Sequence, residues 1–230
     1  MLSITTAELN TLLATFLWPL SRILALIASA PILGNPSIPV RTKLGLAIMI
    51  TILVTPTVEK SLPHIDPASG VGLIILLQQI IIGVAIGFVM RIVFEAVEMA
   101  GEQIGLQMGL GFAVFFDAQH AGQVPLVGRF LGVIASLAFL AINGHLIMIA
   151  LISQSFSTLP VGLDNINETM FSALARWGGE IFKSGLQLSL PVLTALLITN
   201  LALGILTRAA PQLNIFAVGF PLTLSIGFLV

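Results

Sequence analysis

Three glutamates recur at helical spacing near the middle of the chain, at positions 95, 98 and 102. Spacings of three and four residues place Glu95, Glu98 and Glu102 on one face of a helix. Acidic side chains inside membrane segments often carry cations or protons, so a cation or proton path is one interpretation. A polar helix face that is solvated or packed against a partner is the other, and we favour it.

Other arrangements that could do chemistry are weaker. Asn143-Gly144-His145 lies in an apolar segment, where a proton relay is less expected than a hydrogen-bonded packing site. The three histidines are far apart in sequence, which argues against a metal site. The chain has no cysteine and lacks the G-x-x-x-x-G-K-[ST], H-E-x-x-H and G-x-S-x-G motifs. We therefore expect no enzyme, no cofactor and no bound metal; an intramembrane enzyme is the third-ranked alternative.

The stretch GLQMGLGFAVFFDAQHAG, residues 105–122, combines glycines with bulky apolar side chains. We expect a helix to about residue 108, followed by a loop that ends near Pro125. Glycines relieve backbone strain and phenylalanines supply bulk, so the stretch could close a pore. An ordinary loop, or a close helix contact at Gly109 and Gly111, is the alternative. The candidate plug residues are Gly105, Met108, Gly109, Leu110, Gly111, Phe112, Phe115, Phe116 and Asp117.

Composition indicates an integral membrane protein. Of 230 residues, 57% are hydrophobic and 8% are charged, and the net charge is −1. Mean hydropathy is +1.09. A soluble domain usually has about 25% charged residues, so this chain could not cover a soluble surface. No basic field points to nucleic acid.

The apolar runs predict an all-α fold of broken helices and helical hairpins in a single domain. Two prolines should interrupt these helices, Pro19 in the first and Pro191 in the fifth. The last run reaches the C-terminus without a polar end, so we expect the natural chain to be longer. The expected membrane helices are 11–33, 44–58, 71–94, 127–152, 181–207 and a segment that begins near 213.

Arginines lie in or beside several of these apolar runs, for example Arg22 and Arg129. Charges at that depth usually face protein or water. Irregular backbone is tolerated there only when it is buried in protein or lines a wet cavity. Two interpretations stay open: a chain packed inside a larger assembly, or a self-contained bundle with these groups paired internally.

Three segments are similar to one family: SAPILGNPSIPVRTKLGLAIMIT (29–51), GEQIGLQMGLGFA (101–113) and TNLALGILTRAAPQLNIFAVGFPLTLSIGF (199–228). They resemble the FliR family, a membrane component of the bacterial flagellar type III export apparatus. The string APQLNIF-x-x-GFPL at 210–222 is the most distinctive part. Homologues in injectisomes share the pattern, and we prefer the flagellar branch.

The resemblance implies a structural component of an export gate. One such chain would join several copies of FliP and FliQ in a helical hetero-oligomer, with FlhB on the cytoplasmic side. About 1–125 would be FliP-like, and about 126–230 would include a FliQ-like C-terminal hairpin. The gate would lie at the inner membrane in the flagellar basal body, with its core raised toward the periplasm. Unfolded flagellar subunits would pass through it, and the proximal rod would grow from it.

The resemblance also implies that a central loop plugs the conduit, which corresponds to about 106–120 here. Family members commonly have Asp-Pro where this chain has Asp117-Ala118, so the detailed conformation of the loop can differ. A small-solute or ion transporter of the inner membrane is the second-ranked function, because such proteins also contain broken helices and central charges.

Overall fold

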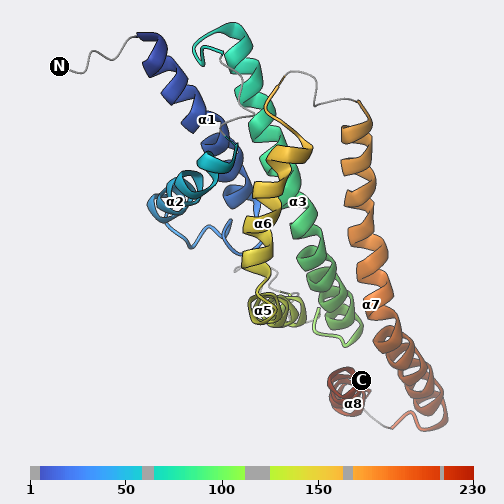
Figure 1. The fold of residues 1–230 in the computed structure, drawn as a ribbon. Helices are drawn as coiled ribbons and strands as arrows, with labels where there is room; N and C mark the ends of the chain where they lie inside the picture. The colour runs from blue at the N-terminus through green and yellow to red at the C-terminus, as the bar shows by residue number, and fades with distance from the viewer. Residues whose placement is uncertain (1–5, 59–64, 112–124, 163–167, 213–214) are drawn as a thin grey trace, which may run out of the picture. The chain divides into compact units, whose positions relative to one another are not determined.

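A computed structural model describes residues 6–58, 65–111, 125–162, 168–212 and 215–230 of the chain. Over these ranges the ordered elements are α-helices, and no strand occurs among them (Figure 1). The helices are α1 (Thr6–Ser29), α2 (Val40–Val58), α3 (Gly70–Gln107), α5 (Leu126–Ala141), α6 (Gly144–Thr158), α7 (Glu168–Ala209) and α8 (Ile215–Leu229).

The predicted all-α membrane fold is confirmed. Three helices, α2, α3 and α7, are long and apolar enough to cross a membrane. The consecutive helices α5 and α6 pass the same test together but are bent by 69°, which makes up to four spans. The expected first and last membrane segments correspond to α1 and α8, whose assessed apolar stretches are shorter.

The chain divides into two compact units, which are described separately. Unit 1 consists of Met1–Ile92 and Ala138–Gly178, and unit 2 of Val93–Leu137 and Gly179–Val230. Helices α3, α5 and α7 contribute residues to both units. The single domain expected from the apolar runs, and the division near residue 125 that the resemblance implies, stay predictions.

The core of unit 1 forms where four helices bring together one apolar stripe each. On α2 the buried positions recur every three or four residues, as a helix with one buried face requires. Side chains of this core are Trp18, Ile23, Leu26 and Ile27 from α1, Ala47, Ile50 and Val54 from α2, Ile75 from α3, and Met148, Ile152 and Phe156 from α6.

Small residues allow α1 and α3 to approach closely within unit 1. A Cβ at Gly83 would collide with the backbone carbonyl oxygen of Arg22 and would lie 2.8 Å from the Cβ of Ala25. One turn further along, a Cβ at Gly87 would lie 2.9 Å from the Cβ of Ser29. Small residues four apart on both helices are the pattern of close packing in membrane proteins.

The predicted continuous helix 127–152 is wrong, because the chain breaks between α5 and α6. Asn143 has φ 58° and ψ 32°, in the left-handed region that asparagine tolerates better than most residues. Gly144 follows directly, and any Cβ there would collide with the ring of Phe139. The helix breaks here because this residue pair permits a backbone conformation that most other pairs resist.

The predicted interruptions at prolines are also wrong. Pro19 lies inside α1, and Pro191 lies inside the 42-residue α7. A proline inside a helix removes one backbone hydrogen bond and clashes with the carbonyl four residues earlier. Membrane helices tolerate this cost when neighbouring groups satisfy the freed carbonyl.

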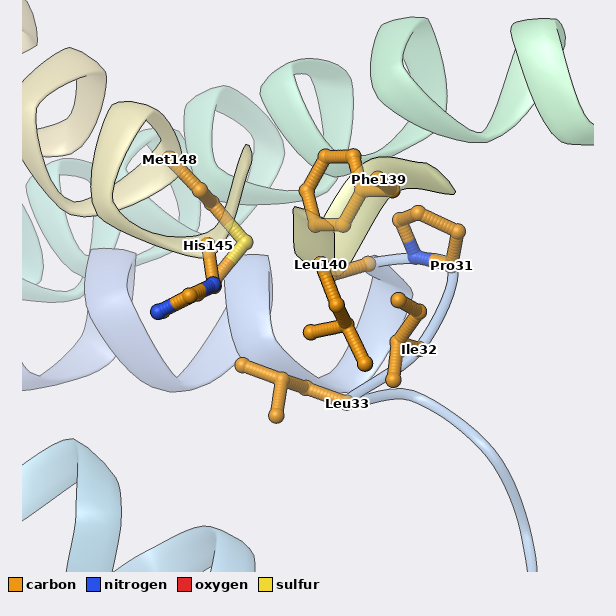
Figure 2. A pocket seen from close by; sticks show the side chains of 8 residues that line it. Pro31, Ile32, Leu33, Phe139, Leu140, His145 and Met148 are labelled. Carbon is orange, nitrogen blue, oxygen red and sulfur yellow. The ribbon is translucent and has the colours of Figure 1, made fainter. Parts of the chain in front are cut away.

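A small apolar pocket of about 40 Å³ lies in unit 1 beside the α5–α6 break. Figure 2 shows His145 and Met148 of α6 approaching it from one side, with Pro31, Ile32 and Leu33 from the segment after α1 on the other. Its volume is enough for about one or two water molecules. The pocket therefore has no room for a solute of ordinary size.

Candidate functional site at the C-terminal end of α3

The first half of the glycine-rich stretch forms the C-terminal end of α3. Gly109 has φ 88°, a left-handed conformation that glycine adopts without strain. Its N–H donates to Leu106 O at 3.1 Å, and the N–H of Leu110 donates to Gly105 O at 3.1 Å. These two bonds form a Schellman motif, which satisfies carbonyls that a helix end leaves open. The expected helix end near residue 108 is thus confirmed, and Gly109 is its cause.

Met108 anchors this helix end in the core of unit 2. Its side chain is 1% exposed and belongs to a buried cluster with Ile104, Val127 and Leu196. Leu110 packs against the same cluster from beyond the helix end. An apolar contact at this position commonly accompanies a Schellman motif and stabilises it. The α3 end is therefore packed from several sides as well as hydrogen-bonded.

Helix α8 contacts the α3 end directly. The hydroxyl of Thr223, which is 6% exposed, donates to Met108 O at 3.1 Å. It also lies 3.0 Å from Phe220 O within its own helix. A Cβ at Gly227 would lie 2.6 Å from Met108 Cγ, so the α8 backbone packs directly on this side chain.

Helices α3 and α5, which precede and follow residues 112–124, cross at glycines within unit 2. A Cβ at Gly101 would lie 2.7 Å from Gly128 Cα, and a Cβ at Gly128 would lie 2.8 Å from Glu98 O. A Cβ at Gly105 would be 3.5 Å from a methyl group of Val127. The two backbones are close enough to exclude a side chain at the crossing.

Sequence reasoning missed this crossing, although its signal is present. Gly101 and Gly105 are four residues apart, and so are Gly128 and Gly132. Small residues at this spacing in apolar helices indicate close helix–helix contact. The sequence suggests such a contact for Gly109 and Gly111, whereas the structure places Gly109 at a helix end.

The three glutamates lie on α3 in unit 2, beside this crossing. Glu95 is half-buried, and Glu98 and Glu102 are exposed. A Cβ at Gly132 would lie 2.6 Å from the Glu98 carboxylate, so this side chain runs across the surface of α5. Contact with a partner, or with water, stays a prediction for this face.

The described plug candidates gather at one place. Gly105, Met108, Gly109, Leu110 and Gly111 all belong to the α3 end. The other candidates lie outside the described residues: Phe112, Phe115, Phe116 and Asp117. Within the described ranges no three His, Cys, Asp or Glu side chains group as metal ligands.

A second polar site, in unit 1, surrounds the buried Arg22. Its guanidinium donates to Gln79 Oε1 from Nε at 2.8 Å, and again from Nη2. Further bonds reach Ser155 O at 2.9 Å, Ser155 Oγ at 3.1 Å and Leu159 O at 2.9 Å. The ring of Phe156 lies 4.1 Å from Arg22 Cζ. These bonds engage the whole donor set of arginine, so the site is structural in character.

Comparison with known proteins identifies the family. A family model described as bacterial export proteins, family 1, matches residues 13–230. The chain belongs to this family. Members and relatives of it carry names that refer to export and to flagellar biosynthesis.

Three relatives show how similar curated proteins are to this chain. The flagellar biosynthetic protein FliR of Escherichia coli K12 is 49% identical over 99% of this chain and 86% of its own length. FliR of Pectobacterium carotovorum is 48% identical over 100% of this chain and 87% of its own length. FliR of Bacillus subtilis 168 is 30% identical over 95% of this chain and 85% of its own length. The chain is therefore a FliR-family component of the flagellar export apparatus, with helices able to span a membrane.

Proposed function

We propose that this chain forms part of the conduit of the flagellar export gate and closes it with residues 106–120. The observation that carries the proposal is the construction of the α3 end. Gly109 stops the helix, Met108 is buried, and the bulky residues Phe112, Phe115 and Phe116 follow immediately in sequence. A seal needs a fixed base and an apolar tip, and the sequence and the base described here fit both needs.

The proposal includes partner chains of the FliP and FliQ type, with FlhB beside them, around one copy of this chain. Exposed apolar surface supports it. In the most apolar window of α7, 11% of the residues are buried within the chain. Exposed apolar side chains on this scale need lipid or protein around them. The assembly would lie at the inner membrane in the basal body, with export substrates and the proximal rod as further contacts.

The chain would do no covalent chemistry and would bind no cofactor. Export would then draw its energy from other components, and this chain would contribute a sealed path. The face with Glu95, Glu98 and Glu102 would contact partners or pore water on the helix that leads to the plug. The transporter alternative gains no support from the pocket of Figure 2, which is apolar and too small for a solute.

The test is ion leak in cells that produce the complete gate. Deletion of 112–119 removes the apolar tip and keeps the α3 end intact, and a triple Phe→Ala variant at 112, 115 and 116 keeps the chain length. Both should leak ions while the complex still assembles. The matched control is Phe130→Ala, which removes an exposed phenylalanine on α5.

Recovery of the complex must be measured with each variant, by co-purification of the partner chains. A gate that assembles, stays tight and supports motility without residues 112–119 would contradict the plug. A leak of the same size in Phe130→Ala would contradict the assignment of sealing to the plug residues.

A further inference from the structure

We propose that Thr223 and Gly227 of α8 position the plug by capping and clamping the α3 end from which it begins. This inference rests on the proposed function of residues 106–120. It concerns α8, more than a hundred residues away in sequence, which nothing above assigns to closure. The juxtaposition is a hydroxyl and a glycine of α8 on the last buried residue of α3.

The hydrogen bond from Thr223 satisfies a carbonyl at the end of α3. The last carbonyls of a helix have no partner in their own helix. The Schellman motif engages Gly105 O and Leu106 O, and Met108 O lies two residues beyond Leu106. Thr223 donates to Met108 O from another helix, at a buried position. A valine at this site has the same shape and leaves a buried carbonyl without this donor.

Gly227 leaves the space that the Met108 side chain occupies. Gly227 faces Met108 so closely that a Cβ would lie 2.6 to 2.8 Å from its Cγ, Sδ and Cε atoms. Because a Cβ at Gly227 would sit inside this contact, Met108 would have to shift. Methionine is a flexible side chain, but Met108 is enclosed by Ile104, Val127 and Leu196 in a close-packed core, so a shift of its side chain should also displace the helix end. Alanine at this position should therefore displace the base of the plug without preventing folding.

The two contacts fix the direction in which the chain leaves α3. Gly109 and Leu110 follow Met108 directly, and Gly109 allows more than one backbone conformation. Hydrogen bonding and packing from α8 select one of them. Loss of either contact would leave residues 112–119 in the chain and change the conformation of the α3 end that precedes them.

The experiment compares Thr223→Val, Thr223→Ser and Gly227→Ala in cells with the complete gate complex. Ser225→Ala is the matched control, since Ser225 is exposed on the same helix and its hydroxyl donates to Pro221 O of that helix. Thr223→Val should raise ion leak on the order of two- to tenfold, the shift that one buried hydrogen bond gives to an equilibrium. Gly227→Ala should also leak, and Thr223→Ser and Ser225→Ala should stay tight.

Thr223→Val is then combined with the deletion of 112–119, and ion leak is measured again. This double variant separates a role in positioning the plug from a general role in stability. With the plug removed, Thr223→Val should add no further leak. Additional leak in that background would overturn the inference, and so would equal leak in Thr223→Val and Thr223→Ser. If Thr223→Val abolishes assembly, Gly227→Ala decides, and a tight gate in that variant would overturn the inference.

The two proposals fail in different ways. If the deletion of 112–119 does not leak, the proposed function is contradicted whatever the α8 variants do. If the deletion leaks while Thr223→Val and Gly227→Ala assemble and stay tight, only the role of α8 is contradicted.

Discussion

At the scale of single residues, the site of Arg22 holds a fully buried guanidinium. A buried guanidinium is costly unless every N–H finds an acceptor. Here the acceptors are neutral: Gln79 Oε1, Ser155 O and Oγ, and Leu159 O. The carbonyls of Ser155 and Leu159 lie at the C-terminal end of α6, where the helix dipole favours a cation. Arg22 therefore connects α1, α3 and the end of α6.

We expect Arg22→Met to lower the stability of the assembled complex by about 2–4 kcal/mol. Methionine fills much of the volume but leaves Gln79 Oε1 and Leu159 O without these donors, at about 1–3 kcal/mol for each buried group. The measurement is the thermal midpoint of the detergent-solubilised complex. Arg41→Met, at an exposed position on α2, is the control and should leave the midpoint unchanged.

Gln79 gives a second test of the same site. Its Nε2 is buried and has no hydrogen-bond partner among the described residues, while Oε1 accepts twice from Arg22. Gln79→Glu replaces the unpaired donor with an acceptor and supplies a counter-charge, so the thermal midpoint should hold or rise. Gln79→Leu removes the acceptor, and its midpoint should fall by an amount similar to that of Arg22→Met. The reverse order of these two variants would contradict the account of the site.

The sequence predicted part of this site. An arginine inside an apolar run must face protein or water, and Arg22 does face protein. Its partners could not be predicted, because Ser155 lies 133 residues away in the chain. Pairing across that distance depends on how α1 and α6 pack, which composition and spacing do not specify.

At the scale of elements, glycine contacts determine how helices cross. Gly101 and Gly128 bring the backbones of α3 and α5 together just before and just after residues 112–124. The crossing therefore holds together the two helices that residues 112–124 join in sequence. Its geometry depends on the absence of side chains at the contact.

We expect Gly101→Ala to destabilise the complex by about 1–3 kcal/mol, because its Cβ meets backbone atoms of Gly128 that have little room to move. Gly204→Ala is the control, since a Cβ at that helical position meets nothing within 4 Å. It should be neutral, or stabilising by up to about 1 kcal/mol through helix propensity. The measurement is the thermal midpoint of the complex with each variant. Equal changes in the midpoint for Gly101→Ala and Gly204→Ala would contradict the crossing.

The break between α5 and α6 can be tested with one destabilising substitution and a second substitution that should partly restore stability. Gly144→Ala should lower the thermal midpoint, because the added methyl group collides with the ring of Phe139. Phe139→Leu should recover part of the loss when the two changes are combined. A double-mutant cycle measures this coupling, and strictly additive effects would contradict the contact.

Helix ends were more predictable than helix interiors. The end of α3 follows from a local glycine signal, and the structure places it within a residue of the expectation. Pro19 and Pro191 suggested interruptions that do not occur, because packing outweighs the local cost of proline. The break at Asn143 was missed, since an asparagine in an apolar run signals polarity at least as readily as a left-handed turn.

At the scale of the whole molecule, apolar side chains remain exposed over much of the described surface. They include Leu126, Phe130, Val133 and Leu137 on α5 and Leu197, Ile198, Leu201 and Ile205 on α7. A chain that functioned alone in lipid could carry such a surface, and so could a subunit covered by partner helices. The sequence left these two interpretations open, because composition measures apolarity and cannot identify what covers it.

We expect the chain to be poorly stable when it is produced alone. Partner helices would cover apolar surface, so yield and thermal midpoint should rise when FliP- and FliQ-type chains are produced with it. The measurement is the amount of monodisperse protein recovered in detergent, with and without the partners. A stable and monodisperse chain obtained alone would favour the transporter alternative.

The central claim is that residues 106–120 close a conduit, and conductance tests it most directly. The purified complex would be placed in a planar lipid bilayer with either the intact chain or the chain lacking 112–119. The account predicts low conductance for the intact complex and a large, sustained conductance for the deletion, at equal amounts of assembled complex. Equal, low conductance in both would contradict the claim and would leave the stretch as a packing loop.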